Sequence, residues 1–325
     1  MKKMTIAALC CGTAGMILMG VGASNASSLD ELASWPEVRI GNSGGFFIRM
    51  QTSQNEAVRL PADLQSQDEL QNAREDLYAK HQYKIDSDPS VIEIEADRGD
   101  LRVEKTDGSQ LLLTTENLPE KGTVQNGRQI SWKVENQTLK VKVEDNTHHL
   151  AKSSSEQPLL ILSVPAKLEN LNLETSLGQI SLDRIEAARC SLATSLGHVR
   201  MQAAKLDSVS AYTALGDIGI ASGKTGKGAF ETSMGDIEID DSVFFSELEA
   251  STALGDVEII LPSGSGQSDL AGADVNLQTS HGQISFEEAP VQSENGISTF
   301  TRANPGASLV IRLETASGNI SLAQK

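Results

Sequence analysis

Five carboxylates on a regular spacing are the residues best placed to do chemistry in this chain. They fall 19 or 20 residues apart in two parallel series, Asp217, Asp236, Asp256 and Glu238, Glu258. Carboxylate oxygens are the ligands that divalent cations such as Ca²⁺ prefer. If the chain stacks these repeats side by side, the acidic row forms a candidate cation site.

A structural interpretation of the same carboxylates competes with this one. Asp after Gly suits a tight turn, so the row can equally be an exposed acidic stripe. Like charges stacked side by side repel one another, and the spacing lacks the nine-residue period of calcium-binding β-rolls. We therefore expect no cofactor and no fixed metal, and the five carboxylates are only weak candidates.

Other catalytic groups are scarce. None of the histidines pairs with a second ligand at zinc-site spacing, and these are His81, His148, His149, His198 and His281. Cys190 falls in an inward-facing column of the repeat described below, which predicts a core residue and not a nucleophile. No phosphate-binding loop is present. We therefore expect a protein that is not an enzyme, with a carbohydrate-active β-helix enzyme using the acidic face as the alternative.

The repeated carboxylates belong to a short sequence motif that recurs with small changes. It reads "ETSLGQISL" from Glu174, "ATSLGHVRM" from Ala193, "YTALGDIGI" from Tyr212, "ETSMGDIEI" from Glu231 and "STALGDVEI" from Ser251. A period near twenty residues is typical of a solenoid, in which each coil buries its apolar face only by stacking on its neighbours. Aromatic residues make up 4% of the chain, so the core must be aliphatic.

The apolar pattern changes parity at the Gly of each unit. When the Thr is position 0, apolar residues fall on even positions before the Gly at +3 and on odd positions, +5 and +7, after it. Because strand side chains alternate between faces, this switch predicts two strands joined at a glycine corner. The predicted corners are Gly178, Gly197, Gly216, Gly235, Gly255, Gly282 and Gly318. The expected fold is an all-β, single-stranded parallel β-solenoid (β-helix) of about 19-residue coils.

The last coils depart from the pattern. His281 and Ser317 take position +2, where the other coils have Leu or Met. Either His281 is a site residue or, as we expect, the core becomes more polar toward an end cap. Two insertions, residues 262–274 and 288–308, could be binding loops or caps. The last unit ends close to Lys325, and if no loop covers it, its free edge could pair with another chain, so self-association through the solenoid end is a hypothesis.

The amino-terminal part reads differently from the repeats. Residues 1–26 have two lysines, an apolar run and small residues at the end, which predicts a signal peptide, with an uncleaved anchor as the alternative. Residues 27–90 form a small α/β-like segment with one amphipathic helix over 62–80. The edge of small residues that the repeat keeps at positions 0 and +1 is expected to be a second crowded corner, with coverage by this helix as the alternative. The solenoid domain is expected over 91–325.

Charge and cysteine content limit which kinds of partner and which compartment are expected. The net charge of −17 disfavours nucleic acid, and signal cleavage would leave Cys190 as the only cysteine and remove the one candidate membrane span. An exported protein in the periplasm or at the cell surface is expected. An envelope protein or a glycan is the expected kind of partner.

The repeated order is Thr, then Ser or Ala, any residue, Gly, Asp or Gln, and finally Ile or Val. This repeat resembles a bacterial family of exported β-solenoid domains known as "putative adhesins", whose function is unknown. The resemblance covers about Val91 to Lys325. It implies a non-catalytic envelope protein linked to cell-surface maintenance or stress, with no defined active site. A cation-dependent adhesive module stays open as a further alternative.

Overall fold

The computed structural model describes residues 37–40, 46–49, 80–125, 127–146, 157–263, 270–286, 291–294 and 296–325. The chain divides into two units, Met1–Leu70 and Gln71–Lys325. The described part of the first is an antiparallel pair, β1 (Glu37–Ile40) with β2 (Phe46–Arg49). The predicted signal peptide and nearly all of the predicted helix lie outside the described residues. Within these ranges no helix is long and apolar enough to cross a membrane.

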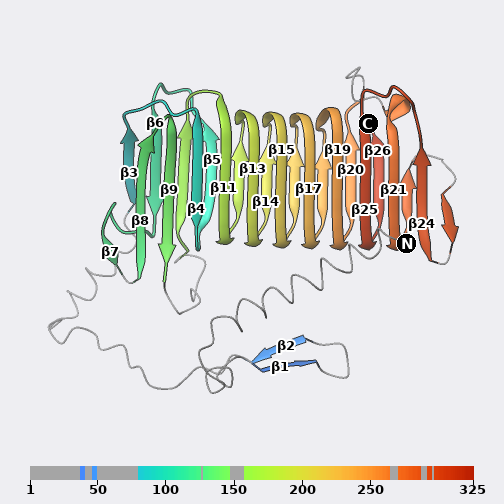
Figure 1. Ribbon diagram of the computed structural model, residues 1–325, viewed down its shortest axis with the longest axis horizontal. Coiled ribbons are helices and arrows are strands. Elements are labelled where there is room, and N and C mark those ends of the chain that lie inside the picture. Colours follow the sequence, from blue (N-terminus) through green and yellow to red (C-terminus); the bar gives the residue numbers. More distant parts are fainter. Residues whose placement is uncertain are drawn as a thin grey trace. The chain divides into compact units, whose positions relative to one another are not determined.

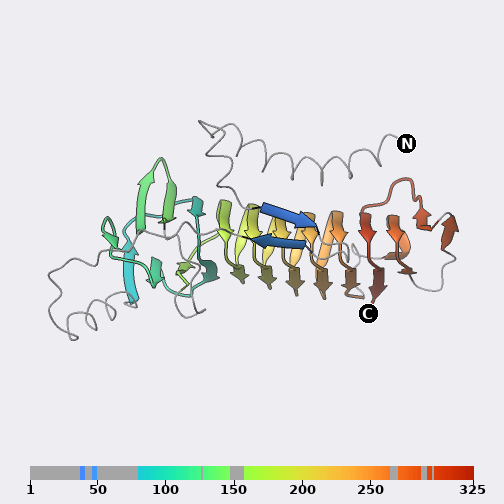
Figure 2. The ribbon, with the colours of Figure 1, turned by 90° about the horizontal axis from the view of Figure 1, so that it is seen from below.

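The repeats of the second unit stack as coils in two sheets (Figures 1 and 2). Each coil has a long strand, a glycine corner and a short strand, and like strands pair in parallel and in register. The long strands lie in a 13-stranded sheet and the short strands in an 11-stranded sheet. The five central coils are β11–β12 (Leu168–Leu177, Ile180–Asp183), β13–β14 (Glu186–Leu196, Val199–Gln202), β15–β16 (Lys205–Leu215, Ile218–Ala221), β17–β18 (Lys224–Met234, Ile237–Asp240) and β19–β20 (Val243–Leu254, Val257–Leu261). The predicted β-solenoid is confirmed.

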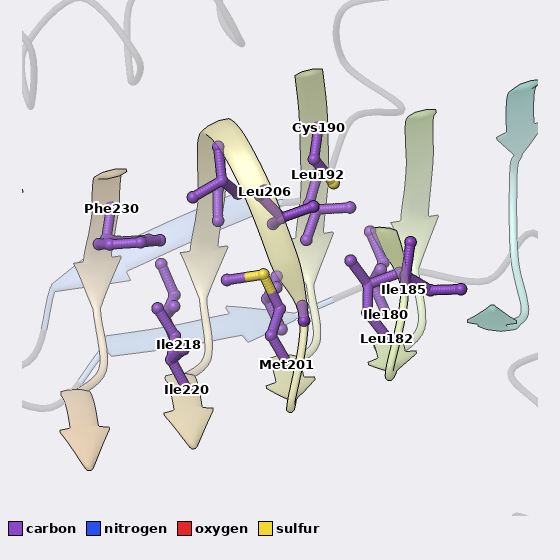
Figure 3. Close-up of a cluster of buried hydrophobic side chains, with 14 of the residues drawn as sticks. Ile180, Leu182, Ile185, Cys190, Leu192, Met201, Leu206, Ile218, Ile220 and Phe230 are labelled. Atoms are coloured by element: carbon purple, nitrogen blue, oxygen red, sulfur yellow. The ribbon is translucent and has the colours of Figure 1, made fainter. Parts of the chain in front are cut away.

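The core lies between the two sheets and is mainly aliphatic. The predicted inward columns are buried: Leu192 at −2, for example, faces Val199 and Met201 at +5 and +7. Figure 3 shows labelled members of these columns, such as Leu192 and Met201, directed into the space between the two strands of their coil. Phe230 and Phe244 are the two buried aromatic rings of the central coils, with centroids 6.1 Å apart in an edge-on arrangement. Gly228 leaves room beside them, because a Cβ there would lie 2.7 Å from both rings.

The carboxyl-terminal coils do not stack in chain order. The last coil, β25 (Val310–Ser317) and β26 (Ile320–Gln324), pairs in parallel with β19 and β20. The coil that precedes it in the sequence, β21 (Asp274–His281) and β22 (Ile284–Phe286), pairs with the other side of β25 and β26 and not with β19 or β20. The chain therefore leaves a one-coil gap after β20 and fills it last, as the red strands of Figure 1 show.

The outer edge of β21 is paired with part of the second insertion. β24 (Ile297–Arg302) pairs antiparallel with β21, and β23 (Gln292–Glu294) pairs with β24. Arg302 donates to the carbonyl oxygens of Leu270 and Ala273, next to the short 3-10 helix η2 (Leu270–Gly272) of the first insertion. These parts of both insertions thus act as a cap. The expectation of a free edge at the last repeat is wrong, because β26 is internal and β22 and β23 are the edge strands.

The amino-terminal end is also closed by strands taken out of order. β9 (Thr138–Asp145) and β10 (Leu159–Val164) form a coil outside β4 (Val91–Ala96) and β5 (Asp100–Lys105), although they follow them in the sequence. Antiparallel strands complete this end: β8 (Arg128–Glu135) and β7 (Val124–Gln125) in one sheet, and β6 (Leu111–Glu116) and β3 (Lys80–Ile85) in the other. The 11-stranded sheet thus begins at Lys80, N-terminal to the expected start at residue 91.

The order of the last coils can be tested by disulfide cross-linking. Ser251 of β19 is in register with Glu314 of β25, so cysteines at these outward positions should lie about 5 Å apart and cross-link. Ser251 and Gln278 of β21 lie two strands apart, about 10 Å, which is too far for a disulfide. We expect S251C/E314C to oxidise nearly completely and S251C/Q278C to stay reduced. The opposite result on non-reducing peptide mapping would show stacking in chain order.

Candidate interaction surface

The glycine corners stack directly on one another along the solenoid. Gly235 has a φ of +148°, and a Cβ there would overlap the carbonyl oxygen of Gly216 in the adjacent coil. A side chain is therefore excluded both by the backbone conformation and by the close approach of the next corner. Gly235 thus lies at the corner of its coil, and the same close approach recurs at the other predicted corners.

The invariant Thr is explained by these corners. Thr232 is 2% exposed and its Oγ1 donates to the carbonyl oxygen of Gly216 at 2.9 Å. The bond recurs through the stack at 2.8 to 3.2 Å and is completed by Ser298 of β24, which donates to Gly282. The hydroxyl thus satisfies a corner carbonyl from inside the coil, which is why neither position varies.

The repeated aspartates have a structural role at the same corner. The backbone N–H of Asp236 donates to Oδ1 of Asp217 at 3.0 Å, and that of Asp256 donates to Oδ1 of Asp236 at 2.8 Å. Asn319 continues the column, because its Oδ1 accepts a hydrogen bond from the backbone N–H of Gln283 at 3.0 Å. Each side chain therefore supplies the acceptor that the next corner lacks, as a turn residue does.

The structure does not gather the five acidic candidates into one site. Asp217, Asp236 and Asp256 follow the corner, whereas Glu238 and Glu258 are paired neighbours on the outer face of the 11-stranded sheet. Within the part of the chain that the structure describes, no group of three or more His, Cys, Asp or Glu side chains is arranged to hold a metal. The five carboxylates therefore lie in two separate rows.

A row of large apolar side chains is exposed beside the corners. Position +2 was expected to face inward with the other even positions, and His281 and Ser317 were interpreted as a core becoming polar. That prediction is wrong, because both are exposed. In the five central coils position +2 is apolar, and we call these five side chains the +2 row. Leu177 is half-buried, and the others are exposed: Leu196 (43%), Leu215 (38%), Met234 (46%) and Leu254 (52%).

The +2 row is continuous because its members are in register. Leu196 pairs with Leu177 on one side and with Leu215 on the other, and Met234 pairs with Leu215 and Leu254. Strict alternation fails here because the strand turns toward the corner, so that +1 and +2 both leave the core. Sequence reasoning missed the row because it assigned faces by parity alone; the signal was a large apolar residue directly before the turn.

The flanks of the +2 row are acidic. The exposed carboxylates of Asp217, Asp236 and Asp256 lie on the side beyond the corner, and exposed Glu174 and Glu231 lie at position −1 on the other side. Positions −1 to +4 of these five coils contain no Lys or Arg. The surface therefore combines an apolar centre with negative borders.

The remaining candidates lie elsewhere. Cys190 is 4% exposed in the core, and burial raises the pKa of its thiol to about 12, so the reactive thiolate is suppressed. His198 is partly exposed and its Nδ1 accepts the N–H of Asp217 at 3.0 Å, within the same corner column. The rings of His81 and Tyr83, both in β3, are stacked with their centroids 6.2 Å apart. His148 and His149 lie outside the described residues.

Comparison with known proteins identifies similar sequences and folds. Residues 84–323 match the profile of a family described as Toastrack DUF4097. No curated protein matches the chain.

Solved structures of similar fold share little sequence with it. A "putative adhesin" from Bacteroides fragilis NCTC 9343 is 15% identical, covers 75% of this chain and 95% of its own, and has a TM-score of 0.44. A "putative lipid binding protein" from Parabacteroides distasonis ATCC 8503 is 14% identical over 76% and 96%, with a TM-score of 0.36. A "putative cell adhesion protein" from Clostridium sporogenes ATCC 15579 is 11% identical over 76% and 100%, with a TM-score of 0.32.

Proposed function

Because this chain belongs to the Toastrack DUF4097 family, we propose that it is a non-catalytic interaction module of the bacterial envelope, with the +2 row as its binding surface. The module is adhesin-like in that it holds a partner and does no chemistry on it. Export by the predicted signal peptide, to the periplasm or the cell surface, is part of this proposal, as is a link to cell-surface maintenance or stress.

The exposed +2 row is the observation that carries the proposal. The other repeated positions stabilise the fold: the Gly forms the corner, the Thr hydroxyl binds it, the Asp joins successive corners, and +5 and +7 fill the core. Position +2 is apolar in five successive coils, although its side chains remain about half exposed. A contiguous apolar patch rimmed by polar groups is typical of an interaction site.

The test is capture of partners from the envelope fraction by the full chain and by a variant without the row. The variant L196S/L215S/M234S/L254S should fold, because Ser317 already occupies the same position in the stack. The matched control V124S/V134S/F245S changes exposed apolar residues outside the row. We expect the wild type and the control to retain a specific protein or glycan that the row variant loses.

Calcium separates this proposal from the alternative of a cation-dependent adhesive module. Capture should be the same with calcium or with a chelator, because the row's contacts are apolar. Capture that requires calcium would favour the cation-dependent module. A partner held equally well by the row variant would show that the binding surface lies elsewhere on the solenoid.

A further inference from the structure

The spacing of the +2 row restricts what can lie along it. Parallel strands are about 4.8 Å apart, so the four steps from Leu177 to Leu254 span about 19 Å, perpendicular to the strands. A partner must present one apolar side chain per coil to use the whole row. This requirement distinguishes between the two regular forms of a peptide segment.

An α-helix meets the requirement better than a strand. Residues three or four apart on a helix repeat on one face every 5.4 Å, so a helix parallel to the stack places about one apolar side chain on each coil. The mismatch of about 0.6 Å per turn accumulates to only about 2.4 Å over the row. Same-face side chains of a strand recur every 6.6 to 6.8 Å or so and lose register after one step.

Charge restricts the partner further. Asp217, Asp236 and Asp256 border the row on one side and Glu174 and Glu231 on the other, with no Lys or Arg between them. A helix with basic residues on both edges of its apolar face therefore complements the surface. The chain's own segment 62–80, predicted from sequence to be helical, has five acidic and two basic residues, and its net charge opposes binding here.

From this complementarity we propose that the +2 row binds the apolar face of a basic amphipathic helix in a partner protein. This inference rests on the proposed function, because it names the chemistry of the partner for the same surface. The apolar residues of the helix pack on the row, and its Lys and Arg side chains pair with the acidic borders.

The test uses a dye-labelled model peptide of about 18 residues, long enough to span about 27 Å as a helix, with a leucine face and lysine elsewhere. Binding to the full-length protein is followed by fluorescence anisotropy. We expect saturable binding that weakens more than tenfold in L196S/L215S/M234S/L254S and is unchanged in V124S/V134S/F245S, because a few central apolar anchors dominate such interfaces. Peptides with scrambled leucines, or with glutamate in place of lysine, should not bind.

The acidic borders are tested separately with D217N/D236N/D256N. Asparagine keeps the acceptor that the next corner needs, as Asn319 shows in the same column. This variant should bind the leucine–lysine peptide several-fold more weakly and with a smaller dependence on salt. Equal binding by the scrambled peptide or by the row variant would overturn the proposal.

The outcomes also distinguish this inference from the proposed function. An envelope partner lost by the row variant, together with no binding of the leucine–lysine peptide, would overturn the basic helix while the interaction module stands. Sedimentation equilibrium covers the remaining occupant: a dimer formed by the wild type and abolished in the row variant would show that a second copy of the chain covers the row, and would also overturn the inference.

Discussion

Replacing Gly235 with alanine is expected to lower the free energy of unfolding by about 4 kcal/mol or more. The new Cβ would overlap the carbonyl oxygen of Gly216, and the residue would have to keep a φ of +148°. Both costs act together because neither corner can move without shifting the coils stacked on it. The measurement is the midpoint of urea unfolding, followed by circular dichroism.

The matched control is Gly219→Ala, three residues along the same coil from the corner at Gly216. A Cβ at Gly219 meets nothing within 4 Å and its backbone has an ordinary φ. Alanine there should be neutral or slightly stabilising, because it reduces the freedom of the unfolded chain. If both substitutions shift the midpoint equally, the corner geometry is not what makes Gly235 essential.

The second large effect is expected at the buried ion pair of the amino-terminal end. The guanidinium of Arg128 donates from Nε to Oδ2 of Asp145 at 3.1 Å and from Nη1 to the carbonyl of Asn117 at 3.2 Å. The two side chains are 9% and 0% exposed. Asp145→Ala should therefore cost about 3 to 5 kcal/mol, because it leaves a buried cation without its carboxylate.

Two further variants show whether the loss comes from the unpaired charge. The double variant R128M/D145L removes both charges and should recover much of the stability. Lys133→Ala on the same strand breaks an exposed pair with Glu135, and the unfolding midpoint should stay unchanged. A double variant that is less stable than Asp145→Ala would contradict this explanation.

Much of the central fold was predictable because every coil repeats the same inward apolar positions, the same glycine corner and nearly the same length. The column that contains Ile218 and Ile237 shows the core, the glycines show the corners, and the spacing shows the stacking. The stack order at the carboxyl end was not predictable. Val275 and Leu277 fit the same inward columns as Ile311 and Leu313, so periodicity cannot tell which coil pairs with β19.

The candidate site was predictable only in part. The aspartates were recognised as repeated, but sequence spacing could not show that Asp217 accepts a hydrogen bond from the backbone of Asp236. The Thr could be seen to be invariant, but its carbonyl partner comes from a neighbouring coil. The +2 row was misassigned because a turn changes which way the backbone points, and alternation holds only within a straight strand.

The out-of-order coil at the carboxyl end also affects how the chain reaches its fold. During synthesis β21 and β22 emerge before β25 and β26, while the edge of β19 and β20 is unoccupied. Thr279 and Thr315 have the same partner type, a corner carbonyl, so the earlier coil can occupy the place of the later one. The chain thus encodes a competitor for its own last coil, and a nascent chain that pairs β21 with β19 has to exchange one coil for the other before it is native.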